Sequence, residues 1–220
     1  LKATFFVNMG REANLLELLK YRSNGLREKD KKITKRYSKT QMIKMAFFQR
    51  KIGSGHPKIL KEIVQRGHEI QPHGWSHLKW SKNFENLDYK KEIYLMRKSF
   101  FNMVGFLPTK FVAPDWKINS TILSYLEKQG FKEVCILKKD IKFFRGDLKI
   151  KPNILSFDKT PEELLQDGKT KQEILNLYKQ EFTKKDAHLY FHADYEGLTG
   201  LNLFDEILKF SLNQRVTNKK

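Results

Sequence analysis

The sequence has very little cysteine, the residue that forms disulfide bonds and binds structural metals. Cys135 is the only cysteine among 220 residues, which excludes an internal disulfide framework and a zinc cluster built from cysteines. No apolar run approaches the roughly 20 residues that a membrane-spanning helix needs, so no such helix is expected. Hydrophobic residues still make up 40% of the chain, which predicts a folded domain rather than a disordered chain.

Acidic residues are also scarce. Asp and Glu number 25 against 43 Lys and Arg, which gives a formal net charge of +18. A charge of this size favours an anionic partner, such as nucleic acid, an acidic lipid surface or a phosphorylated ligand. A lysine-rich composition that only solvates the surface is an equally good interpretation of the charge alone.

An initiator methionine is absent as well. The chain opens with residues 1–7, an apolar stretch that has the pattern of a strand already under way. We therefore expect the natural N-terminus to lie upstream. On that expectation, residues 1–220 exclude neither a targeting signal nor an upstream catalytic residue.

Strand-like and helix-like segments alternate along the chain. This alternation predicts an α/β fold with a parallel sheet or barrel and outer helices, in which working residues cluster at the C-terminal ends of strands. One domain is expected over 1–214, followed by a basic tail over 215–220. The expected strands are 3–7, 68–70, 111–113, 131–137 and 187–192, and the expected helices are 12–19, 57–66, 87–104, 118–129, 171–182 and 201–212.

Residues 21–55 interrupt this rhythm. They are rich in lysine and arginine at first, and over 41–52 Met, Ile and Phe alternate with Lys and Arg. That amphipathic pattern is typical of a helix that lies on a membrane surface. An ordinary helix packed on the domain would have the same periodicity, so both interpretations stand.

The clearest chemical signal is the pair His73 and His77, which lie four residues apart in a His-Gly-Trp-Ser-His motif. On a helical turn this spacing places both imidazoles on one side, where they can chelate one divalent ion. The motif follows an expected strand and Pro72, so the pair should lie at the C-terminal mouth of that strand. Chance could also give two of six histidines this spacing.

His192 is the second signal. It ends the last expected strand, and the period of two places it on one face with His188 and Tyr190. A histidine beside a metal site can serve as a general acid near neutral pH, with Asp194 and Glu196 as carboxylates that orient it. An exposed loop histidine is the alternative.

The segment 111–117 is the third signal. An expected strand ends there in Pro114, Asp115 and Trp116. A proline-braced acid next to a tryptophan could shape a sugar-sized pocket, because carbohydrate faces stack on aromatic rings. Core packing of Trp116 is the equal alternative.

Taken together, these segments resemble the polysaccharide deacetylase (NodB-homology) superfamily in order and spacing over nearly the whole chain. The resemblance rests on residues 2–7, 67–70 and 73–77, on the Pro114 segment and on the strand that ends in His192. Within the superfamily the chain is most similar to the ArnD-like deformylase of lipid A aminoarabinose modification. That likeness rests on residues 8–11, the long insertion, 113–117 and 191–197.

The resemblance implies a distorted (β/α) barrel, lacking its first strand in this chain, and a metal held by two histidines and an aspartate. His73 and His77 match the histidine ligands. The family's aspartate ligand and a neighbouring aspartate base lie on the strand before residues 2–7, so the chain as it stands is expected to be inactive. Val112 and Asp115 replace an arginine and a glycine that are usual in relatives, which bears on substrate shape rather than on reaction type.

The implied reaction removes an N-acyl group, formyl or acetyl, from an amino sugar. The implied cofactor is a divalent metal, zinc or else cobalt, nickel or manganese, which activates water and polarises the amide carbonyl. A polyprenyl-phosphate-linked substrate would account for the basic surface and for the 41–52 segment, and would place the enzyme in the cytoplasm on the inner face of the membrane. His192 would protonate the leaving amine, and the implied substrate-binding residues are Trp75, Pro114, Asp115, Trp116, Asp194 and Glu196.

Three alternatives stay open. The first is a deacetylase of peptidoglycan, chitin-like or capsule sugars that works outside the cell. The second is a basic nucleic-acid-binding module, although the sequence has no recognised helix-turn-helix, zinc-finger or RNA-binding signature. The third is a family member without catalytic activity, which depends on the residues before Leu1.

Overall fold

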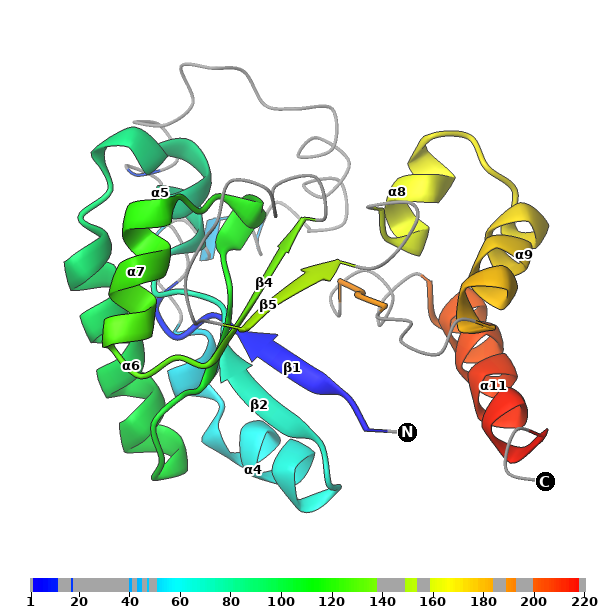
Figure 1. Cartoon of the computed structure of the whole chain (residues 1–220), viewed down its shortest axis with the longest axis horizontal. Helices are drawn as coiled ribbons and strands as arrows, with labels where there is room; N and C mark the ends of the chain where they lie inside the picture. Colours follow the sequence, from blue (N-terminus) through cyan, green and yellow to red (C-terminus); the bar gives the residue numbers. More distant parts are fainter. Residues whose placement is uncertain are drawn as a thin grey trace. The chain divides into compact units, whose positions relative to one another are not determined.

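The chain divides into two compact units, which are described separately. The computed structural model describes residues 2–11, 17, 40, 43–44, 47, 51–137, 149–153, 159–183, 189–192 and 200–217. The larger unit comprises Lys2–Ile136 and Asp140–Ile150, and the smaller unit comprises Leu1, Leu137–Lys139 and Lys151–Lys220. Figure 1 shows helices and strands of both units, labelled where there is room.

The described strands form two small sheets. Strands β1 (Thr4–Val7) and β2 (Glu69–Pro72) pair in parallel, with Val7 opposite Pro72. Strands β3 (Lys110–Val112) and β4 (Glu133–Leu137) also pair in parallel, and β5 (Lys149–Asn153) follows β4 in the strand order. Parallel pairing places the C-terminal ends of neighbouring strands at one edge, where the motif of His73 and His77 begins.

Helices connect and cover these strands, and local sequence signals explain where they begin and end. The helix α6 (Tyr89–Val104) begins after Asp88, whose carboxylate accepts a hydrogen bond from the Lys91 amide, and it ends at Gly105 in the left-handed region with φ 82°. The others are α4 (Pro57–Gln65), α5 (His77–Lys82) and α7 (Ser120–Lys128), with short 3₁₀ turns η2 (Gly53–Gly55), η3 (Phe84–Asn86) and η4 (Pro114–Trp116).

The core of the larger unit lies between the strands and these helices. Trp80, Phe100 and Phe111 are its largest fully buried side chains. Ile93, Met96 and Phe100 supply the apolar stripe of α6 that packs against this core. The burial of this stripe fixes α6 next to β2, so that α6 can contribute to the loop at the end of β2.

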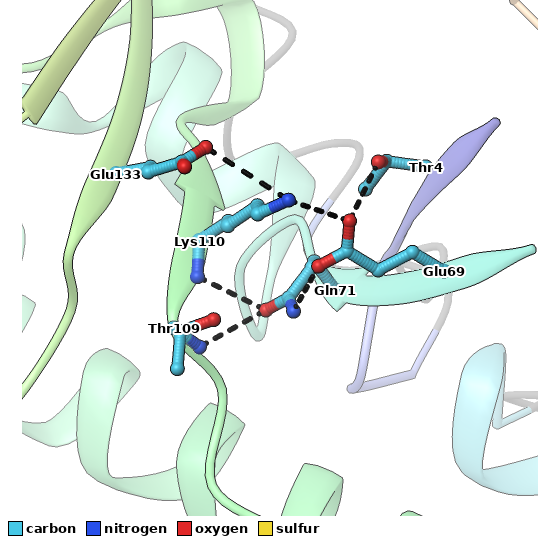
Figure 2. Close-up of polar contacts among 6 residues, drawn as sticks. All are labelled: Thr4, Glu69, Gln71, Thr109, Lys110 and Glu133. Carbon is cyan, nitrogen blue, oxygen red and sulfur yellow. Dashed lines mark hydrogen bonds and ion pairs between the residues drawn. The ribbon is translucent and has the colours of Figure 1, made fainter. Parts of the chain in front are cut away.

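A buried glutamine joins the two sheets. Gln71 of β2 is 3% exposed, and its Oε1 accepts hydrogen bonds from the backbone amides of Thr109, at 3.1 Å, and Lys110, at 3.0 Å. Its Nε2 donates to Oε1 of Glu69 at 2.9 Å. Figure 2 shows this side chain between the two strands. Because β2 and β3 belong to different sheets, one amide side chain takes the place of a ladder between them.

Charged side chains extend this junction across four strands. The carboxylate of Glu69 accepts hydrogen bonds from Thr4 of β1, at 2.9 Å, and from Lys110 of β3, at 2.6 Å. Lys110 also lies 3.9 Å from Glu133 of β4 (Figure 2). Burial acts to raise the pKa of Glu69, but the hydrogen bonds that it accepts, first the one from Lys110, hold its pKa below the usual value.

The smaller unit is helical in its described part. It contains α8 (Pro161–Gln166), α9 (Lys171–Phe182) and α11 (Leu201–Thr217). Capping boxes begin the first two, with Thr160 and Thr170 each bonding a glutamate three residues later. Its core consists of Leu164, Ile174, Tyr178, Leu203 and Ile207.

The expected α/β alternation is confirmed, while a closed barrel is not formed by the strands that the structure describes. The strand expected over 187–192 is wrong where it can be compared, because residues 189–192 lie outside any strand. Strand β5 and helix α8 were not expected. Of the helix expected over 12–19 the structure describes residue 17 alone, which is helical, and most of the 21–55 insertion lies outside the described residues. The expectation of one domain over 1–214 stays a prediction.

Within the described residues, no helix has both the length and the apolar character to cross a bilayer. In the amphipathic part of the insertion, residues 43, 44 and 47 are helical. Ile43 is 59% exposed and Phe47 is 72% exposed. These two side chains do not pack into the core of the larger unit.

The junction at Gln71 gives the first prediction. Gln71→Met should lower the free energy of unfolding by about 1–3 kcal/mol, because two partly buried backbone amides lose their acceptor. The control Gln65→Met changes an exposed glutamine of α4 and should stay within about 0.5 kcal/mol of the unmodified protein. Urea denaturation measures both, and equal losses in the two variants would contradict the role given to Gln71.

Candidate active site

The structure brings His73 and His77 together. Their ring centroids lie 5.5 Å apart, with an angle of 53° between the planes. His73 directly follows β2 and His77 is the first residue of α5, so the pair does not share one helical turn as expected. A tight turn makes the approach instead, and Gly74 adopts φ 103° within it, in the region that favours glycine.

One hydrogen bond orients the His73 ring. Its Nδ1 lies 2.8 Å from the carbonyl oxygen of Val112, at the end of β3. Because a carbonyl only accepts, Nδ1 carries the proton and the lone pair of the neutral ring is on Nε2. Metal-binding histidines are commonly held in this way, with the second nitrogen bonded to a carbonyl or carboxylate. The ring of His73 therefore has the tautomer that a metal ligand needs.

Close backbone packing fixes the turn that carries these histidines. The His73 amide donates to the Val7 carbonyl at 2.8 Å, and the Met9 amide donates to the Gly74 carbonyl at 3.0 Å. A Cβ on Gly10 would lie 2.1 Å from the carbonyl oxygen of Trp75, so only glycine fits there. The end of β1 is thus a wall of the site.

A buried glutamate holds the same turn from the other side. Glu92 of α6 is 4% exposed, and its carboxylate accepts a hydrogen bond from the Ser76 amide at 2.9 Å. Lys79 lies 3.7 Å from the same carboxylate. Ser76 in turn caps α5, since its side chain accepts from the Lys79 amide. Glu92 therefore positions the residue that precedes His77.

Sequence reasoning missed Glu92, although a signal was available. The residue lies one helical turn from Met96 and two from Phe100, within the buried stripe of α6. An acid in such a stripe needs a partner, because burial disfavours its charged form. Burial raises the pKa of Glu92, and the Ser76 hydrogen bond and the Lys79 charge only partly offset this increase.

The segment after β3 lies against the histidine turn. A Cβ on Gly74 would lie 3.0 Å from Cγ of Pro114, which is buried. Asp115 and Trp116 have φ 55° and 57°, an uncommon conformation for residues with side chains. Trp116 is half-buried and does not belong to the core cluster, and Trp75 is also half-buried. The structure thus brings Pro114 and His73 to one site.

His192 belongs to the smaller unit and is half-buried. Its Nδ1 lies 3.7 Å from Oε2 of Glu162, a carboxylate whose side chain is 4% exposed. The neighbouring Tyr190 hydroxyl donates to Glu163 at 3.3 Å. Asp194 and Glu196, expected to orient His192, lie outside the described residues. Glu162 was not expected in that role.

Two imidazoles on one edge are a donor set that suits zinc and similar divalent metals. In the part of the chain that the structure describes, no group of three or more His, Cys, Asp and Glu side chains could hold a metal. Asn8, which follows β1, has a buried Oδ1 without a hydrogen-bond partner in that same part. The described residues therefore fit a metal as two of its ligands.

Comparison with known proteins finds one matching family model and a relative of similar sequence. The family model "Polysaccharide deacetylase" matches residues 1–134. A peptidoglycan deacetylase of Helicobacter pylori (strain ATCC 700392 / 26695) is 36% identical over 76 residues, which are 33% of this chain and 25% of that relative. The match thus spans about a quarter of the relative's length.

Solved structures are similar at lower identity. A family 4 carbohydrate esterase from Streptomyces lividans, in complex with acetate, is 15% identical with a TM-score of 0.50, and the match covers 100% of this chain and 88% of that chain. The Xyl-CE4 domain of a multidomain xylanase from the hindgut metagenome of Trinervitermes trinervoides is 16% identical with a TM-score of 0.42, over 73% and 65% of the two chains. The first of these supports the fold.

The buried carboxyl of Glu92 predicts an unusual pH dependence. Because burial raises its pKa, the folded protein holds this proton more tightly than the unfolded chain. The stability from this group is complete below the ordinary pKa of about 4.3 and is lost as the pH rises through the higher folded-state value. The unmodified protein should therefore gain stability relative to Glu92→Gln as the pH falls from about 7 to about 4.

Urea denaturation across this pH range tests the prediction, with Glu85→Gln as a control at an exposed position. Glu92→Ala removes the acceptor of the Ser76 amide as well, and should cost about 1–3 kcal/mol more than Glu92→Gln. A stability difference between Glu92→Gln and the unmodified protein that does not vary with pH would contradict the account.

Proposed function

The chain belongs to the polysaccharide deacetylase family, and from this premise we propose that it serves as a metal-dependent hydrolase that removes an N-acyl group from an amino sugar. The observation that carries the proposal is the pair of imidazoles at the end of β2, 5.5 Å apart, with His73 bonded through Nδ1 to a backbone carbonyl. The family supplies the reaction class, hydrolysis of an amide bond in an acylated glycan. The acyl group that we propose is acetyl or formyl.

His73 and His77 are the proposed ligands of the metal. When bound, a divalent ion such as zinc polarises the acyl carbonyl and increases the acidity of a bound water. The bond from His73 to Val112 keeps Nε2 of His73 as the donor nitrogen, and Glu92 keeps His77 at the start of α5. The third ligand and the catalytic base, both aspartates in the family resemblance, are proposed to come from sequence that precedes position 1.

His192 is the proposed general acid, which protonates the leaving amine. The neighbouring carboxylate of Glu162 supports this role, because it lies 3.7 Å from Nδ1 and can orient the ring. Trp75 and Trp116, both half-buried, are proposed to stack on the sugar. Pro114, Asp115, Asp194 and Glu196 complete the proposed substrate-binding set.

The identity of the substrate is a separate part of the proposal. A polyprenyl-phosphate-linked sugar at the inner face of the cytoplasmic membrane is supported by the net charge of +18 and by the exposed side chains of Ile43 and Phe47. Peptidoglycan is the alternative substrate, and the Helicobacter relative is named for it. Both substrates require the same chemistry at His73 and His77.

Metal binding tests the central part of this proposal. The protein should bind about one zinc ion per chain, and His73→Ala or His77→Ala should weaken binding by at least about tenfold, because one imidazole cannot chelate. His56→Ala removes an exposed histidine and should leave zinc affinity unchanged. Calorimetric titration measures these affinities, and equal zinc binding by all three variants would refute the assignment.

The role of His192 has its own test. In a form of the protein that releases acetate or formate from an N-acyl amino sugar, His192→Ala should lower kcat by about 10²–10⁴-fold. The zinc content should stay the same, because His192 is not proposed as a ligand. Loss of zinc together with activity would contradict the assignment of His192 as the acid.

Membrane contact is tested by flotation with vesicles that contain anionic lipid. Changing both Phe47 and Phe48 to Ser should release the protein from the vesicles, since the sequence pattern of 41–52 predicts a helix that inserts apolar residues into a membrane surface. The control changes Phe101 and Phe106 to Ser, two phenylalanines that are each 47% exposed elsewhere in the larger unit. Unchanged flotation of the first variant would remove the membrane from the proposal.

A further inference from the structure

A surface hollow lined by three cations lies next to the histidine turn. Its volume is about 670 Å³, within the range of ligand sites in proteins. Arg11, Lys51 and Lys98 line it, and Trp75, the residue between Gly74 and Ser76 of the turn, forms part of its wall. All of these residues belong to the larger unit. The hollow therefore adjoins the turn that carries His73 and His77.

Backbone hydrogen bonds fix the positions of two of the three cationic residues. Arg11 and Lys51 face each other in an isolated antiparallel bridge, and the Ile52 amide donates to the Gly10 carbonyl at 2.9 Å. These bonds close the base of the insertion directly beside the end of β1. The insertion thus returns to the domain at the hollow, and Arg11 and Lys51 are held side by side.

Helix α6 supplies several of the residues that line the hollow. Leu95, Lys98, Ser99 and Asn102 line the hollow at the spacing of one helical face. Lys98 thereby joins the other two cations, while Ser99 and Asn102 add neutral hydrogen-bonding groups. The hollow combines three positive charges with an aromatic ring and polar side chains.

These charges have no compensating carboxylate among the described residues. The described lining contains no Asp or Glu, and Arg11, Lys51 and Lys98 form no ion pair with a described acid. Other lysines of the same unit are paired, such as Lys79 with Glu92 and Lys110 with Glu69. The positive potential of the hollow is therefore available to a ligand.

We propose that this hollow binds the phosphate group of the substrate, so that the acylated amino sugar is a glycosyl phosphate. The inference rests on the proposed hydrolase function and assigns the phosphate of its substrate to the residues that line this hollow. A phosphate carries up to two negative charges and several acceptor oxygens, which matches three cations and three neutral polar side chains better than a single carboxylate does. The sugar ring would lie against Trp75, with its acyl group toward His73 and His77.

Binding of inorganic phosphate tests the site without any catalysis. Changing Arg11, Lys51 and Lys98 together to Gln should weaken phosphate binding at least tenfold in calorimetric titrations at low salt. The matched control changes three exposed lysines outside the hollow, Lys61, Lys128 and Lys132, to Gln. These substitutions lower the net charge by the same amount. The control should bind phosphate within twofold of the unmodified protein. Lys98→Gln alone, at an exposed position, should weaken binding at least threefold and needs no further folding check.

Two results would overturn the proposal. One is no phosphate binding by the unmodified protein. The other is an equal loss in the two triple variants, which would mean that overall charge rather than the hollow attracts the anion.

A series of sugars separates the sources of the anion. N-acetylglucosamine 1-phosphate should bind at least tenfold more tightly than N-acetylglucosamine, and the triple change at Arg11, Lys51 and Lys98 should abolish this advantage. Tighter binding of N-acetylmuramic acid, which carries a carboxylate, would overturn the assignment to phosphate.

The same series separates this inference from the function on which it rests. Acyl release from a neutral sugar with no preference for the phosphate would leave the hydrolase standing and refute the hollow. Preferential binding of the phosphate without acyl release from any sugar, in a form that carries the complete metal site, would support the hollow and refute the hydrolase.

Discussion

The hydrogen bond from the His73 ring to the Val112 carbonyl is the contact on which the site depends. It crosses from β2 to β3, two strands that belong to different sheets, and two residues earlier on the same face of β2 Gln71 bonds the amides at the start of β3. Side chains thus join the strands at both ends of β3. The junction that holds the fold together here also selects the tautomer of a proposed metal ligand.

Burial near this junction disfavours a charged group that the site nevertheless needs. The charged form of Glu92 is disfavoured by burial, yet its carboxylate is the acceptor that holds the Ser76 amide. Gly10 allows a backbone contact that no Cβ would permit, and Gly74 adopts a φ of 103°, which favours glycine. The histidine turn is therefore specified by three elements, namely the end of β1, the end of β3 and one face of α6. Such support from rigid elements is what a preorganised site requires.

The sequence predicted the elements that local signals determine. The helix over Lys171–Phe182 was predicted with its observed bounds, and His73 and His77 were found from their spacing. The bridging role of Gln71 was not predicted, because it depends on which strands become neighbours. The alternating pattern of 187–192 led to a wrong prediction of a strand. Phe191 instead stacks on Tyr178 and contacts Phe204 of α11, and the described residues 189–192 pair with no strand. Alternation of apolar residues shows a buried face but does not show what covers it.

Nitrogen-15 NMR of the two imidazoles, followed during a zinc titration, tests the central claim most directly. The account predicts that His73 carries its proton on Nδ1 before zinc is added, and that Nε2 of His73 and a ring nitrogen of His77 shift together, saturating at about one equivalent. A proton on Nε2 of His73, or rings that respond to zinc at different stoichiometries, would contradict it.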